Sequence, residues 1–202
     1  QVAHPHHVAL VAGDIHAVQH PCAIVRDLEA PEREELGSLG LDVRIEQDLL
    51  AGDLDTAVVD LADLGPAVLD PGSAPASEAV TAIGAARLLV VASPVYKGSY
   101  TGLLKAFLDR FPPGGLTGVV AVPVMVGASP GHAVSAEAYL RPVLLELGAT
   151  CPTPAVYLQE QSLVHVGSAA TEDPSVRDPI ATWCAQHAWL VRSALAGSPV
   201  AA

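Results

Sequence analysis

The chain of 202 residues is long enough for one domain with a full hydrophobic core and too short for two domains of ordinary size. Half of its residues are apolar, which excludes disorder of the whole chain. The net charge of −12 argues against a nucleic-acid-binding protein, because such a chain has no excess of cations to displace counterions from phosphates.

The N-terminal part predicts one strand and two helices. Residues 1–7 are expected to be disordered. Residues 8–12 form a short apolar run that Gly13 closes, and this run predicts the first strand. Two helix candidates follow, at residues 22–28 and 31–39.

The second strand has two candidates. Residues 56–61 are rich in β-branched and apolar side chains and are the preferred one. The alternation of Leu41, Val43 and Ile45 is the rival. After a Pro/Gly/Ser-rich loop at residues 70–76, Ser77 stands where a helix N-cap is expected. The helix behind it buries three apolar residues, Ala79, Val80 and Ile83.

The rest of the chain continues the alternation. Residues 88–92 predict the third strand and residues 101–111 the next helix, which ends at the Pro-Pro-Gly-Gly run of residues 112–115. Residues 119–126 predict the fourth strand. Pro123 lies inside that strand, and a proline there suits an edge or a bulge better than a central position.

The C-terminal elements complete the pattern. Residues 134–147 predict a helix that ends at Gly148, and residues 156–158 a short fifth strand. Residues 178–195 predict a last helix with two tryptophans, one expected in the core and one at an interface. Strands that alternate with helices predict an α/β domain over residues 1–202: a flavodoxin-like, doubly wound parallel sheet of five strands, order 2-1-3-4-5, with helices on both faces.

The strand, loop and helix of residues 88–111 are the most informative segment. In open parallel sheets, ligands bind beyond the carboxyl ends of the strands. The segment therefore predicts a binding loop, and the alternative is an ordinary connection between strand and helix. The loop consists of polar and flexible residues: Ser93, Pro94, Val95, Tyr96, Lys97, Gly98 and Ser99.

This loop and its continuation to Lys105 resemble the NAD(P)H-dependent FMN reductase family, in particular the branch that supplies reduced flavin to two-component monooxygenases. Two other segments carry the resemblance, which covers residues 56–160. Residues 60–66 are similar to the end of the family's second strand. Residues 127–132, with 140–144 and 147–149 behind them, are similar to its second flavin loop and the helix that follows.

The resemblance implies FMN and NAD(P)H as cofactors and hydride transfer from nicotinamide to flavin. The backbone of the first loop would wrap the polar edge of the isoalloxazine ring. The ring's other side would face the second loop, with Gly127, Ala128, Ser129 and His132 as candidate binding residues; a plain helix-entry turn is the alternative for that loop. Because the flavin carries the chemistry, no catalytic side chain is predicted.

The resemblance also implies partners. A flavin-dependent monooxygenase would receive the reduced FMN, and the chain would form a homodimer or homotetramer. In some members a tyrosine inserted in the helix after the second loop shapes the tetramer, and Tyr139 lies near that place.

The segment after the predicted first strand departs from the family. Members carry a loop rich in Ser, Thr and Arg there, which binds the FMN phosphate through hydroxyls, amides and a cation. In this chain only Gly13 matches, and no Ser or Thr stands between it and Ser38. Residues 14–55 are therefore a divergent or extended segment, in which three residues are the substitutes available to phosphate: His16, His20 and Arg26.

Two other functions stay open beside flavin reduction. One is a flavodoxin-like accessory or binding subunit with weak or no FMN binding, which the altered phosphate loop favours. The other is a quinone, azo or metal-ion reductase on the same fold.

The three cysteines and the hydropathy of the chain bear on metal binding and on the cellular compartment. Cys22, Cys151 and Cys184 have no metal-ligand spacing and indicate free thiols in a reducing compartment. No metal site is predicted. The chain shows no apolar run of about 20 residues and no signal-peptide pattern, so a cytoplasmic protein is expected.

Overall fold

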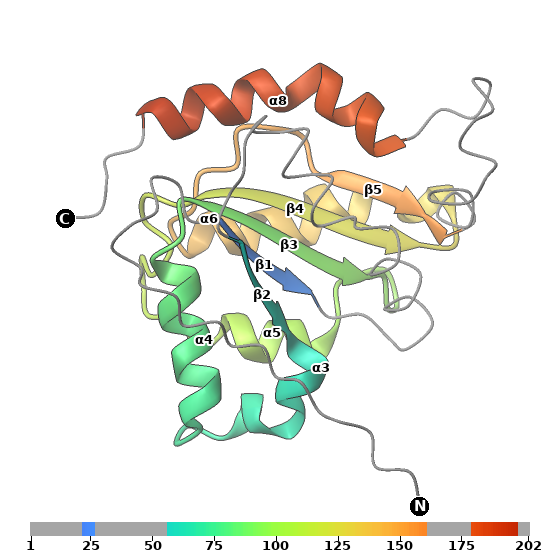
Figure 1. The fold of residues 1–202 in the computed structure, drawn as a ribbon. Helices are drawn as coiled ribbons and strands as arrows, with labels where there is room; N and C mark the ends of the chain where they lie inside the picture. The colour runs from blue at the N-terminus through green and yellow to red at the C-terminus, as the bar shows by residue number, and fades with distance from the viewer. Residues whose placement is uncertain (1–21, 27–55, 161–178, 198–202) are drawn as a thin grey trace, which may run out of the picture.

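The computed structural model describes residues 22–26, 56–160 and 179–197. Five parallel strands form one sheet in the order β2-β1-β3-β4-β5, and helices cover it (Figure 1). The predicted doubly wound α/β architecture is therefore confirmed. The strands are β1 (Cys22–Arg26), β2 (Thr56–Asp60), β3 (Leu88–Pro94), β4 (Val120–Gly127) and β5 (Val156–Gln159).

The strand β1 corrects the sequence prediction, which made residues 22–28 a helix. Val25 pairs with Val59 of β2 on one side and with Val91 of β3 on the other, and it is fully buried. A run of four apolar residues, Cys22 to Val25, suits a buried strand as well as a helix, so its place between two other strands decides its conformation. The predicted strand at 8–12, the helix at 31–39 and the rival strand at Leu41, Val43 and Ile45 lie outside the described residues.

Three short helices connect β2 with β3: α3 (Leu61–Leu64), the 3₁₀ helix η2 (Gly65–Leu69) and α4 (Ala74–Gly84). The predicted N-cap of α4 is wrong. Ser73 caps this helix, since its hydroxyl accepts a hydrogen bond from the Ala76 amide at 3.3 Å. The Ser77 hydroxyl instead donates to the Ser73 carbonyl, so Ser77 lies within the first turn.

The strand β4 lies between β3 and β5, and its proline is nevertheless accommodated. The Ala121 amide donates to the Thr150 carbonyl, on the β5 side of the strand. Pro123 faces the same side, two residues further on, whereas β5 pairs with β4 only from Val124 onward. The backbone nitrogen of Pro123, which carries no hydrogen, therefore faces the gap between Thr150 and the start of β5. No strand is present there to accept a hydrogen bond from this position.

The helix after the second loop contains a change of winding. A 3₁₀ turn, η3 (Pro130–His132), leads into a π-helical turn, η4 (Ala136–Leu140), and then into α6 (Arg141–Glu146). The predicted helix at 134–147 is confirmed. Gly148 follows with φ +93°, a conformation that favours glycine at a helix end.

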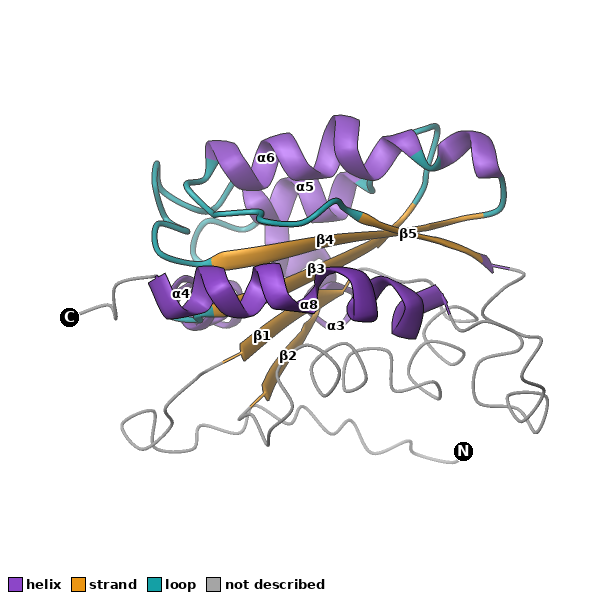
Figure 2. Cartoon of the chain, turned by 90° about the horizontal axis from the view of Figure 1, so that it is seen from above, coloured by secondary structure: helices purple, strands orange, loops and turns teal. Residues whose placement is uncertain are grey.

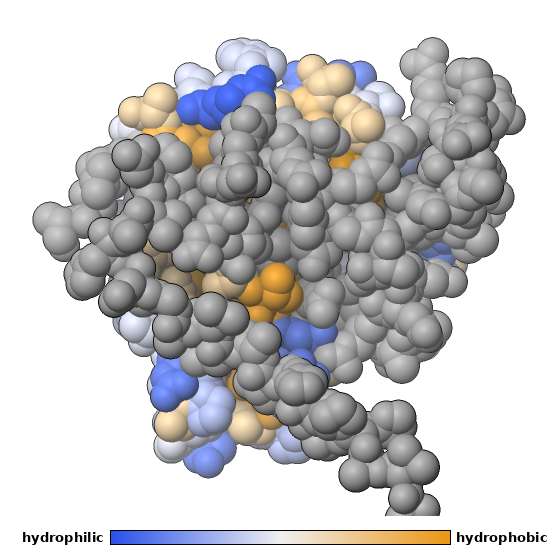
Figure 3. All heavy atoms as spheres, in the orientation of Figure 1, coloured by the Kyte–Doolittle hydropathy of each residue, from blue (hydrophilic) through white to orange (hydrophobic). Residues whose placement is uncertain are grey.

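The two faces of the sheet pack against different helices (Figure 2). Leu88, Val90 and their neighbours on one face pack against α8 (Pro179–Gly197), the helix predicted at residues 178–195. Leu89 and Val91 face the cluster formed with α4, α5 (Gly102–Leu108) and α6. Where the described residues show in Figure 3, hydrophilic and hydrophobic side chains are mixed over α8, as expected of a helix that buries only one face.

The two tryptophans of α8 differ in burial. Trp183 packs against the buried cluster beneath the helix, whereas Trp189 is 60% exposed. The expectation that one belongs to the core is therefore confirmed for Trp183.

Candidate functional site

The strands β3 and β4 end next to one another and place both sequence-predicted loops at one edge of the sheet. Pro94, the last residue of β3, is paired with Val126 of β4. The first loop (residues 93–99) and the second loop (residues 127–132) leave the sheet at this point. Carboxyl ends of parallel strands are where ligands bind in this kind of fold.

The first loop is a tight hairpin turn. The Tyr96 amide donates to the Ser99 carbonyl at 2.7 Å, and the Ser99 amide donates back to Tyr96 at 3.0 Å. The two residues between them both have positive φ, +52° at Lys97 and +82° at Gly98, as in a type I′ turn. Such a turn holds its own backbone in one shape, so the loop is preformed.

The base of the first loop is anchored by buried hydroxyl groups. The Ser93 side chain is completely buried; its oxygen accepts from the Thr101 amide at 3.2 Å and donates to the Pro94 carbonyl at 3.1 Å. Thr101 in turn caps α5, since its Oγ1 accepts from the Leu104 amide at 3.1 Å. The strand end and the helix start are thereby tied together beneath the turn.

The second loop is shaped by a close approach at Gly127. A Cβ atom at this position would lie 2.7 Å from the hydroxyl oxygen of Tyr157 and 3.2 Å from Cγ2 of Val95. The Tyr157 hydroxyl donates to the Ser129 carbonyl at 2.6 Å, and burial raises the pKa of Tyr157. Ser129 caps the following 3₁₀ turn by accepting from the Gly131 amide.

Two hydrogen bonds join the first loop to the residues on either side of the second loop, one at the base of the first loop and one at its tip. At the base, the Val95 amide donates to the Val126 carbonyl at 2.7 Å. At the tip, the Ser135 hydroxyl donates to the Gly98 carbonyl at 2.8 Å. The loops therefore form one surface, although 27 residues, 100–126, separate them in the sequence.

This surface presents hydrogen-bond donors to solvent. Neither the Lys97 nor the Gly98 amide bonds to a described residue, because the turn is closed by the groups of Tyr96 and Ser99. The Lys97 side chain is exposed and adds a positive charge at the tip. In the second loop, Nδ1 of His132 is buried and lacks a hydrogen-bond partner among the described residues.

The sequence-predicted binding residues are thus brought together where the structure describes them. Ser93 and Pro94 are buried at the base, Tyr96 and Lys97 are exposed at the tip, and Ala128 is exposed on the second loop. Gly13 lies outside the described residues.

Three residues that shape the loops were missed by sequence reasoning as parts of the site. The position of Thr101 before Gly102 is a capping signal and places it at the helix start. No sequence signal points to Ser135 or Tyr157, whose contacts are with residues far away in the chain.

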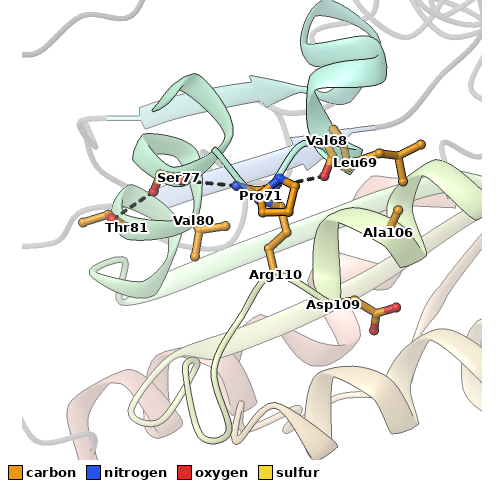
Figure 4. Close-up of a pocket in the computed structure, with 9 residues that line it drawn as sticks. All are labelled: Val68, Leu69, Pro71, Ser77, Val80, Thr81, Ala106, Asp109 and Arg110. Carbon is orange, nitrogen blue, oxygen red and sulfur yellow. Dashed lines mark hydrogen bonds between the residues drawn. The ribbon is translucent and has the colours of Figure 1, made fainter. Parts of the chain in front are cut away.

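A separate cavity of about 700 Å³ lies between η2, α4 and α5, and none of its lining residues belongs to the two loops (Figure 4). Arg110 lies across it and donates to the carbonyl oxygens of Val68 and Asp70 at 3.0 and 2.7 Å and to the Ser77 hydroxyl at 3.1 Å. These bonds tie the η2–α4 connection to the end of α5, which gives the arginine a structural role.

Searches for other kinds of site in the described part of the chain give negative results. It contains no group of three or more His, Cys, Asp or Glu side chains arranged to hold a metal ion. None of its helices is long and apolar enough to cross a membrane. Cys151 and Cys184 are buried thiols that form no disulfide within the described residues.

Comparison with known proteins gives a family and several relatives. Residues 43–162 match the family described as NADPH-dependent FMN reductase. An FMN reductase (NADPH) of Escherichia coli is 31% identical over 104 residues, which cover 49% of this chain and 54% of that protein. The NADH-dependent FMN reductase SfnF of Pseudomonas putida is 37% identical over 139 residues, 67% of this chain and 68% of that one. The chain thus spans only about half the length of the first of these curated relatives.

Solved structures agree on the fold. The apo form of an NADH:FMN oxidoreductase (EMOB) superposes with a TM-score of 0.69 at 29% identity, covering 90% of this chain and 91% of that one. A flavodoxin from an archaeon superposes with a TM-score of 0.52 at 12% identity, a likeness of the fold alone.

Proposed function

The chain belongs to the NADPH-dependent FMN reductase family, and on this premise we propose that it is an NAD(P)H:FMN oxidoreductase whose flavin ring is held by the first and second loops. The observation that carries the proposal is the preformed turn at Tyr96–Ser99. The amides of its two central residues, Lys97 and Gly98, have no partner among the described residues, and the turn lies at the carboxyl edge of the sheet, where the second loop also begins.

The donor set fits an isoalloxazine ring. The polar edge of this ring offers hydrogen-bond acceptors, and the successive amides of Lys97 and Gly98 are donors held in a preformed turn. His132 Nδ1, which has no partner among the described residues, is a further group for a ligand to satisfy. Both observations favour a flat, polar ligand at this edge.

In this proposal the protein positions the flavin ring and stabilises the negative charge that the ring gains. When bound, FMN supplies the atom that accepts the hydride from the nicotinamide. The Lys97 and Gly98 amides would stabilise the negative charge that the ring gains, because fixed dipoles aimed at developing charge need no reorganisation. The buried bonds of Ser93 and Thr101 keep these dipoles in place.

Lys97 also has an electrostatic role in the proposal. FMN and NAD(P)H are both anionic, whereas the chain carries a net charge of −12. An exposed ammonium group at the tip of the first loop would attract the phosphates locally against the unfavourable overall field.

The test combines binding and turnover. FMN is titrated into the purified protein while flavin fluorescence is followed, and NAD(P)H oxidation is measured with and without added FMN. We expect quenching and FMN-dependent oxidation. Quenching without oxidation would exclude a reductase and leave an FMN-binding protein, and the absence of both would favour the accessory subunit with weak or no FMN binding.

A matched pair of variants localises the site. Gly98 and Gly118 both have strongly positive φ, +82° and +87°, and no atom lies within 4 Å of a Cβ built at either. Alanine should therefore strain both backbones by about 1 kcal/mol. Gly118 precedes β4 at the opposite edge of the sheet, so only Gly98→Ala should weaken FMN binding, by about tenfold.

Two finer parts of the proposal come from the resemblance: a partner monooxygenase that receives reduced FMN, and a homodimer or homotetramer. A third, a cytoplasmic location, is supported by the cysteine pattern, which indicates a reducing compartment. The oligomer is supported by exposed apolar side chains at Val134, Tyr139 and Leu145, along the helical segment after the second loop. Light scattering on the purified protein measures the number of subunits. Turnover of a candidate monooxygenase with and without the protein tests the partner.

A further inference from the structure

The side chain of Ser135 is buried and does not cap its own helix. It is 2% exposed and has helical backbone angles, φ −63° and ψ −36°, immediately before the π-helical turn of Ala136–Leu140. Its side chain makes no capping hydrogen bond there. The hydroxyl donates instead to the Gly98 carbonyl at 2.8 Å, 37 residues away.

This bond completes the restraint of one peptide unit in the first loop. The unit between Gly98 and Ser99 has its N–H bonded to the Tyr96 carbonyl at 3.0 Å and its C=O bonded to Ser135. Both the N–H and the C=O group of this peptide unit are thus held by hydrogen bonds. The orientation of the Gly98 amide, one residue earlier, depends on this unit because neighbouring peptides share a Cα.

We propose that Ser135 is a positioning residue that acts through Gly98 to aim the amides of the first loop at the flavin ring. This inference rests on the proposed function. The bond from Val95 to Val126 lies at the base of the loop, whereas the bond from Ser135 reaches its tip. Without the hydroxyl the turn keeps its internal bonds but loses its fixed angle to the second loop.

The test measures the FMN dissociation constant by fluorescence quenching for Ser135→Ala and Ser135→Cys. Alanine removes the donor, and cysteine keeps nearly the same shape with a much weaker donor. Both variants should bind FMN about five- to tenfold more weakly, the effect of one lost hydrogen bond. The absorption band of bound FMN should shift in both, since its hydrogen-bonding environment changes.

The control is Ser77→Ala. The Ser77 hydroxyl also donates to a backbone carbonyl, that of Ser73 at 2.8 Å, but it lies on α4 beside the Arg110 cavity. Its removal should lower the melting temperature and leave FMN affinity within twofold of the unmodified protein.

A double-mutant cycle separates positioning from general loosening. If Ser135 acts through Gly98, Ser135→Ala should weaken binding much less in a Gly98→Ala background than alone. Equal effects in both backgrounds, or an affinity within twofold for Ser135→Ala, would overturn the inference. Failure of the unmodified protein to bind FMN would instead overturn the proposed function.

Discussion

The hydroxyl oxygen of Tyr157 lies 2.7 Å from the point that a Cβ atom on Gly127 would occupy. The tyrosine cannot easily move away, because the same hydroxyl donates to the Ser129 carbonyl at 2.6 Å. The shape of the second loop therefore depends on a glycine in β4 and on a phenol in β5.

Gly127→Ala should destabilise the fold by about 1–3 kcal/mol, the usual effect of forcing extra volume into a packed site, and should weaken FMN binding. Adding Tyr157→Phe removes the nearest clashing atom and should restore part of the stability. Gly102→Ala is the matched control, since no atom lies within 4 Å of its Cβ position. Thermal unfolding and FMN titration measure both effects, and equal losses at Gly102 and Gly127 would contradict the steric explanation.

Removing the cap of α5 should loosen the base of the first loop. Thr101→Ala deletes the acceptor for the Leu104 amide and should cost about 1 kcal/mol. For a domain of this size that corresponds to a melting temperature lower by about 2–4 °C. Thr101→Ser keeps the acceptor and should melt close to the unmodified protein; a serine variant as unstable as the alanine one would refute the capping role.

Lys97 adopts a left-handed conformation, with φ +52°, that suits asparagine better than a branched side chain. Lys97→Asn and Lys97→Ile both remove the positive charge. The isoleucine variant should be less stable than the asparagine variant by about 1 kcal/mol or more, as chemical denaturation would measure. Both should raise the KM for NAD(P)H at low salt, and a difference between the two KM values would point to the backbone rather than the charge.

The stability should fall at alkaline pH because of Cys151. Burial raises the pKa of this thiol from about 9 to about 11. Between these values the folded state holds a proton that the unfolded state has lost, so raising the pH favours unfolding. The loss should be about 1 kcal/mol between pH 9 and pH 10. Unfolding of Cys151→Ala in the same buffers is the comparison, and a decline as steep as that of the unmodified protein would exclude the thiol as its cause.

The parts of the fold with strong local signals were predictable. The apolar run at Leu88 and the helix that begins after Thr101 have the expected places, because strand, turn and cap are encoded in adjacent residues. The cap of α4 was misassigned to Ser77. The Ala-Pro pair after Ser73 is the stronger signal, since proline belongs to a helix's first turn.

Other features depend on partners that the sequence does not show. Cys22–Arg26 is a strand because β2 and β3 lie on its two sides. Pro123 is tolerated in a central strand because β5 begins one residue later in the register. The contacts of Ser135 with Gly98 and of Tyr157 with Ser129 join segments nearly 30 or more residues apart, so no local pattern predicts them.

The position of α8 bears on how the protein is made. The helix is the last described element, yet five of its side chains, from Ile180 to Leu195, bury one face of β3 and β4. The Arg87 guanidinium, just before β3, donates to the Leu195 carbonyl near its end. During synthesis, the part of that face which α8 covers stays without the helix until the ribosome has released α8. Chaperones would therefore have an apolar surface to bind in the nascent chain until the final turns of this helix emerge.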